Sequence, residues 1–153
     1  MNEIENHEKW MLKAIKQAEK AYSCDEVPIG CVIIKDDAII GQGYNQVEQL
    51  NDATAHAEMI SITSAANYLG DWRLNNCSLY VTKEPCIMCF GAIINSRIKS
   101  LYYGFQDLNS GFKIKIKDEY LLSSHLENIE HGIRENQCKH LIENFFINKR
   151  KKQ

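Results

Sequence analysis

Two short segments about thirty positions apart constrain this chain more than any other feature. The first is His-Ala-Glu at 56–58, and the second is Pro-Cys-Ile-Met-Cys at 85–89. Imidazole and thiolate ligands suit Zn²⁺, whereas Mg²⁺ and Ca²⁺ prefer oxygen. With three protein ligands, the fourth tetrahedral position stays open to water, as in catalytic zinc sites. The chain is therefore expected to bring His56, Cys86 and Cys89 together at one metal ion.

Glu58 lies two residues after His56 and is free to act on the water at such a site. Zinc lowers the pKa of bound water toward about 7 in favourable sites. A carboxylate beside that water can take and return protons. We therefore predict Glu58 as the catalytic residue of a zinc hydrolase.

Local sequence predicts that the metal lies between two helix starts. Residues 55–69 are typical of a helix, with Thr54 or Asp52 as its cap. Pro85 suits a first helical position, and Cys86 and Cys89 are three apart and would share a face of one turn. The positive ends of two helices would favour thiolates and a hydroxide.

Other interpretations of the cysteines remain at this point. The Cys-x-x-Cys pair could be buried apolar residues or a redox pair. A structural zinc could take a fourth cysteine, although none of the candidates is paired with another ligand at short spacing. These candidates are Cys24, Cys31, Cys77 and Cys138. The combination of His-x-Glu with Pro-Cys-x-x-Cys, in this order, resembles the signature of zinc-dependent nucleobase deaminases.

Composition is that of an ordinary globular protein. The 153 residues are enough for one domain, with 44% apolar and 25% charged residues. The polar N-terminus does not resemble a signal peptide, and no apolar run is long enough to span a membrane. Six cysteines without an export signal indicate reduced thiols and a cytoplasmic protein.

The net charge of −2 argues against general coating of nucleic acid, but basic residues gather late in the chain. Lys113, Lys115 and Lys117 alternate with apolar residues, and Lys-Arg-Lys-Lys occupies 149–152. These groups could be a solvated strand face and a solvated tail. They could also contact the phosphates of a folded RNA.

Helical and strand patterns alternate along the chain. Helices are predicted at 3–22, 55–69, 85–95 and 133–148, and strands at 29–34, 38–44, 78–82 and 98–103. Residues 106–132 give no clear pattern. This order predicts an α/β fold with a mixed sheet, helices on both faces and right-handed crossovers. The metal ligands would then lie at one end of the sheet.

Most of the chain resembles the cytidine-deaminase-like superfamily and, within it, the bacterial tRNA-specific adenosine deaminases. The segments that carry the resemblance are 27–30, 41–45, 52–59, 79–89, 91–98 and 132–150. The resemblance implies one zinc-dependent deaminase domain over residues 1–153, folded as a three-layer α/β/α structure around a central mixed five-stranded sheet. After Asp107, Leu108 to Phe112 replace the small residues usual in that family.

The resemblance implies deamination of adenosine to inosine at the wobble position of a tRNA anticodon stem-loop, with the target base flipped into the pocket. Each subunit of a homodimer would hold one Zn²⁺ on the ligands predicted above. The implied substrate contacts are Asn45 to the nucleoside, the Ala57 N–H to the base edge, and Asp107 and Phe146 to the RNA.

Two alternatives remain. The same zinc site would serve a deaminase of a free base or nucleoside, such as guanine, cytosine or cytidine. A non-catalytic, zinc-stabilised RNA-binding module is the other, and the presence of Glu58 and of only three ligands argues against it.

Overall fold

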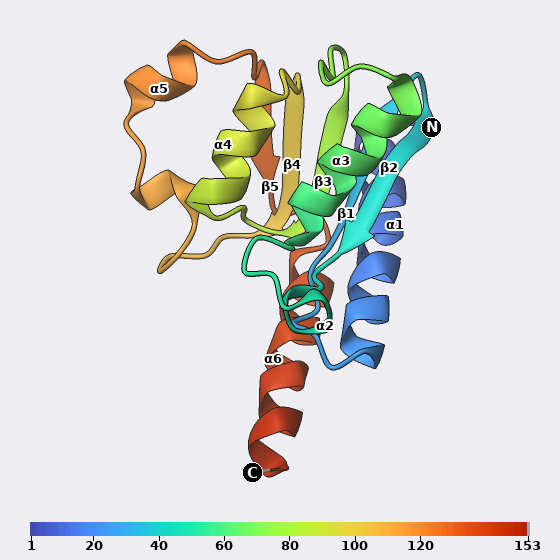
Figure 1. The fold of residues 1–153 in the computed structure, drawn as a ribbon, viewed down its shortest axis with the longest axis vertical. Coiled ribbons are helices and arrows are strands. Elements are labelled where there is room, and N and C mark those ends of the chain that lie inside the picture. Colours follow the sequence, from blue (N-terminus) through green and yellow to red (C-terminus); the bar gives the residue numbers. More distant parts are fainter. Residues whose placement is uncertain (153) are drawn as a thin grey trace.

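Helices and strands alternate along the chain in the computed structural model, which describes residues 1–152 (Figure 1). The elements in order are α1 (Glu3–Ser23), β1 (Gly30–Lys35), β2 (Ala38–Tyr44), α2 (Val47–Leu50), α3 (Ala57–Leu69), β3 (Ser78–Lys83), α4 (Ile87–Asn95), β4 (Ser100–Phe105), the short 3₁₀ helix η1 (Phe112–Ile114), α5 (Asp118–Leu122), β5 (Asn128–His131) and α6 (Glu135–Lys151).

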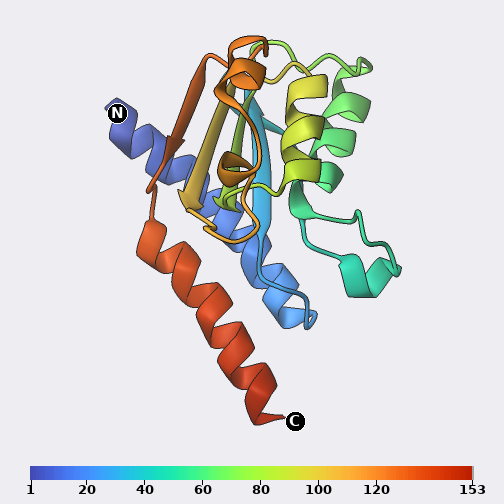
Figure 2. The ribbon, with the colours of Figure 1, turned by 90° about the vertical axis from the view of Figure 1, so that its left-hand side faces the viewer.

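The five strands form one mixed sheet in the order β2-β1-β3-β4-β5. Strand β1 runs antiparallel to β2 and β3, whereas β3, β4 and β5 are parallel to one another. Helices α3 and α4 cover one face, and α1 and α6 cover the other (Figure 2). The predicted three-layer α/β/α architecture is confirmed.

Each face of the sheet has its own apolar core. Under α3 and α4, Phe90 and Phe112 join the inward side chains of the strands. On the opposite face, Trp10 and Met11 of α1 pack with Cys138 of α6. Burial of a large apolar side chain contributes about 1.5–3 kcal/mol. The two cores therefore fix the helices against the sheet.

Two glycines of β2 allow the helix that begins at the candidate metal site to lie close to the sheet. A Cβ on Gly41 would lie 2.6 Å from the Ser61 carbonyl oxygen, and one on Gly43 would lie 2.7 Å from Ile60 Cγ2. Both distances are too short for a real side chain. Glycine at these positions therefore sets the depth at which α3 packs.

Several predicted boundaries are wrong by about two residues, as is common at helix ends. The predicted helices at 55–69 and 85–95 begin at Ala57 and Ile87, so Pro85 is not a helical residue. The segment 106–132, which gave no pattern, contains η1, α5 and the edge strand β5. Within residues 1–152, every helix is too short or too polar to cross a membrane.

Candidate metal centre and active site

The metal-ligand candidates lie where two helices begin, at the carboxyl end of β3. His56 is the N-cap of α3, Cys86 is the N-cap of α4, and Cys89 lies in the first turn of α4. Neither Thr54 nor Asp52 caps α3, because the Asp52 carboxylate instead accepts a hydrogen bond from the Thr54 N–H at 2.8 Å. The two helix starts nevertheless meet as the sequence predicts. Their positive ends stabilise negative charge on the thiols between them.

The spacing of the three side chains fits a tetrahedral zinc ion. His56 Nδ1 lies 3.6 Å from Cys86 Sγ and 3.5 Å from Cys89 Sγ. Nitrogen and sulfur ligands at about 2.0 and 2.3 Å from a tetrahedral zinc lie about 3.5 Å apart. Among residues 1–152, this is the only group of three potential ligands, and no fourth cysteine joins it. The structural-zinc alternative therefore lacks its fourth ligand.

Glu58 lies directly beside this group but is not part of it. Its side chain is 4% exposed, and burial raises the pKa of the carboxyl group above its ordinary value. Glu58 lines one small cavity together with His56 and Cys86. A carboxyl group whose pKa is raised by burial keeps its proton to a higher pH than an exposed carboxyl group does, so it is better suited to give a proton as well as to take one. This is the property that a proton-transferring residue of a hydrolase needs.

The pKa values of the two thiols are shifted in opposite directions. A hydrogen bond from the Cys89 side chain lowers the pKa of Cys86 to about 3, and the His56 ring contributes in the same direction. The pKa of Cys89 is raised by its hydrogen bond with Cys86 and by burial. Cys86 is therefore a thiolate at neutral pH even before a cation is added, and a cation would deprotonate the second thiol.

His56 also lines a cavity of about 270 Å³. Asn45 lines this cavity at 7% exposure, and its Nδ2 donates to the Val27 carbonyl oxygen at 3.3 Å. Its Oδ1 is buried and accepts no hydrogen bond within the described chain. Ala57 also lines the cavity, and its N–H has no acceptor in its own helix because it lies in the first turn. An acceptor and a donor thus lie beside one cavity.

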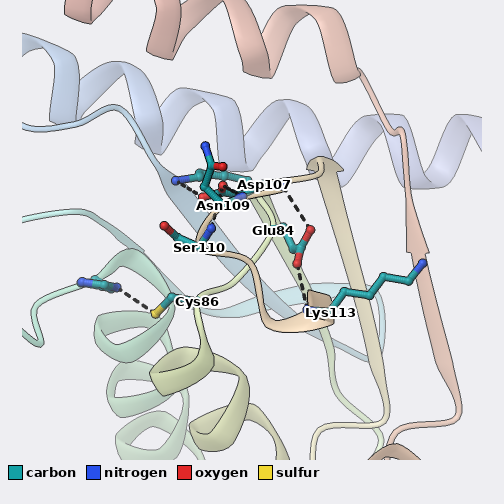
Figure 3. Close-up of polar contacts among 8 residues, drawn as sticks. Glu84, Cys86, Asp107, Asn109, Ser110 and Lys113 are labelled. Carbon is teal, nitrogen blue, oxygen red and sulfur yellow. Dashed lines mark hydrogen bonds and ion pairs between the residues drawn. The ribbon is translucent and has the colours of Figure 1, made fainter. Parts of the chain in front are cut away.

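A smaller cavity of about 70 Å³ lies against Glu58 and Cys86. It is also lined by Asp107, which follows β4. The Asp107 carboxylate is 2.9 Å from Lys83 Nζ and accepts hydrogen bonds from the N–H groups of Asn109 and Ser110, each at 3.0 Å (Figure 3). Asp107 therefore shapes its own loop, and an RNA contact by its carboxylate stays a prediction.

The C-terminal helix contributes an aromatic ring to the larger cavity. Phe145 is 4% exposed and lines it, whereas Phe146 is 41% exposed and packs edge-on against Phe145. The contact of Phe146 with RNA stays a prediction. The sequence did not identify Phe145 as a residue of the site, although it placed Phe145 on the apolar side of the predicted helix. It also missed Glu26, whose carboxylate accepts from the N–H groups of Glu48 and Gln49 at 2.9 and 2.8 Å.

Known proteins share both the sequence and the fold. Residues 5–150 match the MafB19-like deaminase family. The tRNA-specific adenosine deaminase of Buchnera aphidicola subsp. Schizaphis graminum is 44% identical over 143 residues, which cover 92% of this chain and 94% of the relative. The chain belongs to the tRNA-specific adenosine deaminases. Members of this family are hydrolytic enzymes, so the non-catalytic alternative loses its support.

Solved structures agree with this assignment. A structure from work on A-to-I editing by tRNA:A34 deaminases at the wobble position of transfer RNA superposes with a TM-score of 0.80 and 38% identity, over 87% of this chain and 98% of that chain. A guanine deaminase from Bacillus subtilis has a TM-score of 0.64 and 35% identity, over 80% and 75% of the two chains. A guanine deaminase from Nitrosomonas europaea has a TM-score of 0.81 at 21% identity, over 90% and 83% of the two chains. The fold is therefore shared by tRNA deaminases and free-base deaminases, and sequence identity is higher to the tRNA deaminase.

Proposed function

We propose that this protein uses one Zn²⁺ per subunit to deaminate adenosine to inosine at the wobble position of a tRNA anticodon stem-loop. The observation that carries the proposal is the placement of His56, Cys86 and Cys89 at tetrahedral spacing, with the buried Glu58 carboxyl group beside them. The names of the relatives at about 40% identity support tRNA as the substrate.

The chemistry needs a water nucleophile and a residue that moves protons. Zinc on the three ligands would supply the first by lowering the pKa of a water molecule in the open fourth position. Glu58 takes the proton of the attacking water and delivers a proton to N1 of the purine ring. The hydroxyl oxygen bonds to C6, and Glu58 then moves the remaining proton of that hydroxyl to the C6 amine. The C6–N bond breaks, ammonia leaves and the C6 carbonyl of inosine forms. Burial suits Glu58 to this exchange because it raises the pKa of the carboxyl group.

The cavity beside His56 would hold the flipped nucleoside. Its volume of about 270 Å³ lies just below the range of about 300–1,000 Å³ that is usual for small-molecule sites. The free Asn45 Oδ1 would accept a hydrogen bond from the nucleoside, and the Ala57 N–H would donate to the base edge. Phe145 would pack against the substrate from α6. Asp107 and Phe146 are proposed as contacts to the rest of the anticodon loop, at the rim of the site.

The same proposal covers the assembly and the location. Residues 1–153 would act as a single deaminase domain within a homodimer, as the resemblance implies. Because tRNA is the substrate, the enzyme would act in the cytoplasm. Sedimentation of the zinc-loaded protein tests the dimer, since a monomer at micromolar concentration would contradict this part of the proposal.

The main alternative is deamination of a free base or nucleoside, which the same zinc site would support. Zinc-loaded protein should be incubated separately with an anticodon stem-loop that carries adenosine at the wobble position, and with free adenosine, cytidine and guanine. Release of ammonia only from the stem-loop supports the proposal. Release only from a free base or nucleoside would overturn the assignment of the substrate and retain the zinc chemistry.

A further inference from the structure

A second buried carboxylate lies next to the metal-ligand segment and has no place in the proposed chemistry. Glu84 follows β3 and directly precedes Pro85, and its side chain is 5% exposed. Its Oε1 accepts from the Asp107 N–H and its Oε2 from the Lys113 N–H, both at 3.1 Å (Figure 3). Each carboxylate oxygen therefore holds one end of the same loop, residues 107–113.

This 107–113 loop packs against the segment that contains the two ligand cysteines. Cys86 and Gly111 pair as an antiparallel bridge, and the Phe112 N–H donates to the Pro85 carbonyl oxygen at 2.9 Å. The Phe112 ring stacks on Phe90 of α4, with the ring centres 3.9 Å apart. The loop thus fixes both the backbone at Cys86 and the first turns of the helix that contains Cys89.

The contact between the carboxylate and the loop is close. A Cβ added to Gly111 would collide with the Glu84 carboxylate. The peptide at this position therefore lies against the carboxylate on one side and pairs with Cys86 on the other. Any displacement of the carboxylate would move the backbone that borders the thiolate.

We propose that Glu84 is a positioning residue for the metal centre: through the 107–113 loop it holds Cys86 in place for the zinc ion. This inference rests on the zinc site of the proposed function. It concerns retention of the metal and not proton transfer. Residues that orient metal ligands without binding the metal change metal affinity or activity by about 10- to 100-fold when they are replaced.

Glu84→Gln is the sharpest variant because it keeps the shape of the side chain. An amide has one acceptor oxygen, and its NH₂ group cannot accept a hydrogen bond. One of the two loop N–H groups would then face a donor, and the loop would move away from Cys86. The variant should hold zinc about 10- to 100-fold more weakly than the wild-type protein and should therefore lose zinc to a chelator faster.

The test mixes protein holding one Zn²⁺ per chain with an excess of the chromogenic chelator 4-(2-pyridylazo)resorcinol and follows zinc release with time. The control is Asp71→Asn, since the Asp71 carboxylate also accepts from a backbone N–H group, that of Arg73 at 3.0 Å, and lies beyond the end of α3 opposite to His56. Zinc release from the control should occur at the wild-type rate. Equal rates in wild type and Glu84→Gln, or equal acceleration in the control, would overturn the proposal.

Two further measurements apply if Glu84→Gln does not fold. Gly111→Ala disturbs the same contact from the loop and should also accelerate zinc release. In the wild-type protein, zinc should slow hydrogen exchange at the amides of Asp107 and Lys113, because coupling between the loop and the metal is reciprocal. Exchange unaffected by zinc would contradict the proposal. None of these measurements uses RNA, so failure of the proposed substrate would be recognised separately.

Discussion

Replacement of Glu58 by glutamine separates proton transfer from metal binding. Glutamine has nearly the same volume but does not exchange protons near neutral pH. Because Glu58 is not among the three ligands, the variant should hold zinc at the wild-type stoichiometry. Deamination should fall by about 10²- to 10⁴-fold, the usual contribution of a general acid or base. This loss corresponds to about 2.7–5.4 kcal/mol of barrier, at 1.36 kcal/mol for each factor of ten.

The burial of Glu58 adds a prediction about stability. Burial raises its pKa above the ordinary value of 4.5. The stability that Glu58 contributes to the zinc-free protein is then present below the unfolded-state pKa and is lost as pH rises through the folded-state pKa. Glutamine does not titrate. The zinc-free Glu58→Gln variant should therefore gain stability relative to the zinc-free wild-type protein as pH rises above about 4.5.

The assay measures kcat on the stem-loop at saturating substrate, with zinc content determined by metal analysis on the same preparation. Thermal unfolding of the zinc-free proteins at several pH values tests the stability prediction. Full zinc content with the predicted loss of kcat supports the role of Glu58. Loss of zinc from the variant would show that Glu58 is a ligand, and wild-type kcat would show that another group transfers the proton.

Three further predictions concern the ligands and the larger cavity. Cys86→Ala should lose zinc. A chelator should then lower the Tm of the wild-type protein and leave the Tm of the variant unchanged. An equal fall in Tm for both proteins would contradict the role of Cys86 as a ligand. Asn45→Ala should raise KM by up to about tenfold, since a neutral hydrogen bond contributes about 0.5–1.5 kcal/mol, and an unchanged KM would exclude this contact. Phe145→Ala should destabilise the fold by about 3–5 kcal/mol in denaturant unfolding. Phe146→Ala should cost roughly half as much or less, because its ring is 41% exposed, and equal costs would refute the assigned packing.

The metal-ligand candidates could be predicted from the sequence because ligand chemistry is local. Spacing and residue type were enough to select His56, Cys86 and Cys89, and the structure brings their ligand atoms within 4.8 Å of one another. The three-layer architecture could also be predicted, because helical and strand periodicities alternate strongly up to β4. The strand β5 was missed because all four of its residues are exposed and lack an apolar alternation.

Contacts that depend on the folded chain could not be predicted. Glu84 accepts hydrogen bonds from residues 23 and 29 positions away, and backbone donors leave no trace in the sequence. Phe145 and Phe146 are both aromatic, and only the rotation of α6 decides which of them reaches the cavity. The helix starts were placed too early because His56 and Cys86 cap their helices without a side-chain hydrogen bond.

A competition assay tests the proposed function most directly. The zinc-loaded protein would receive the wobble-adenosine stem-loop and free guanine together, with inosine in the RNA and xanthine read by mass spectrometry. Inosine at the wobble position without xanthine is the predicted result. Xanthine without inosine would contradict the proposal and show that this zinc site serves a free base.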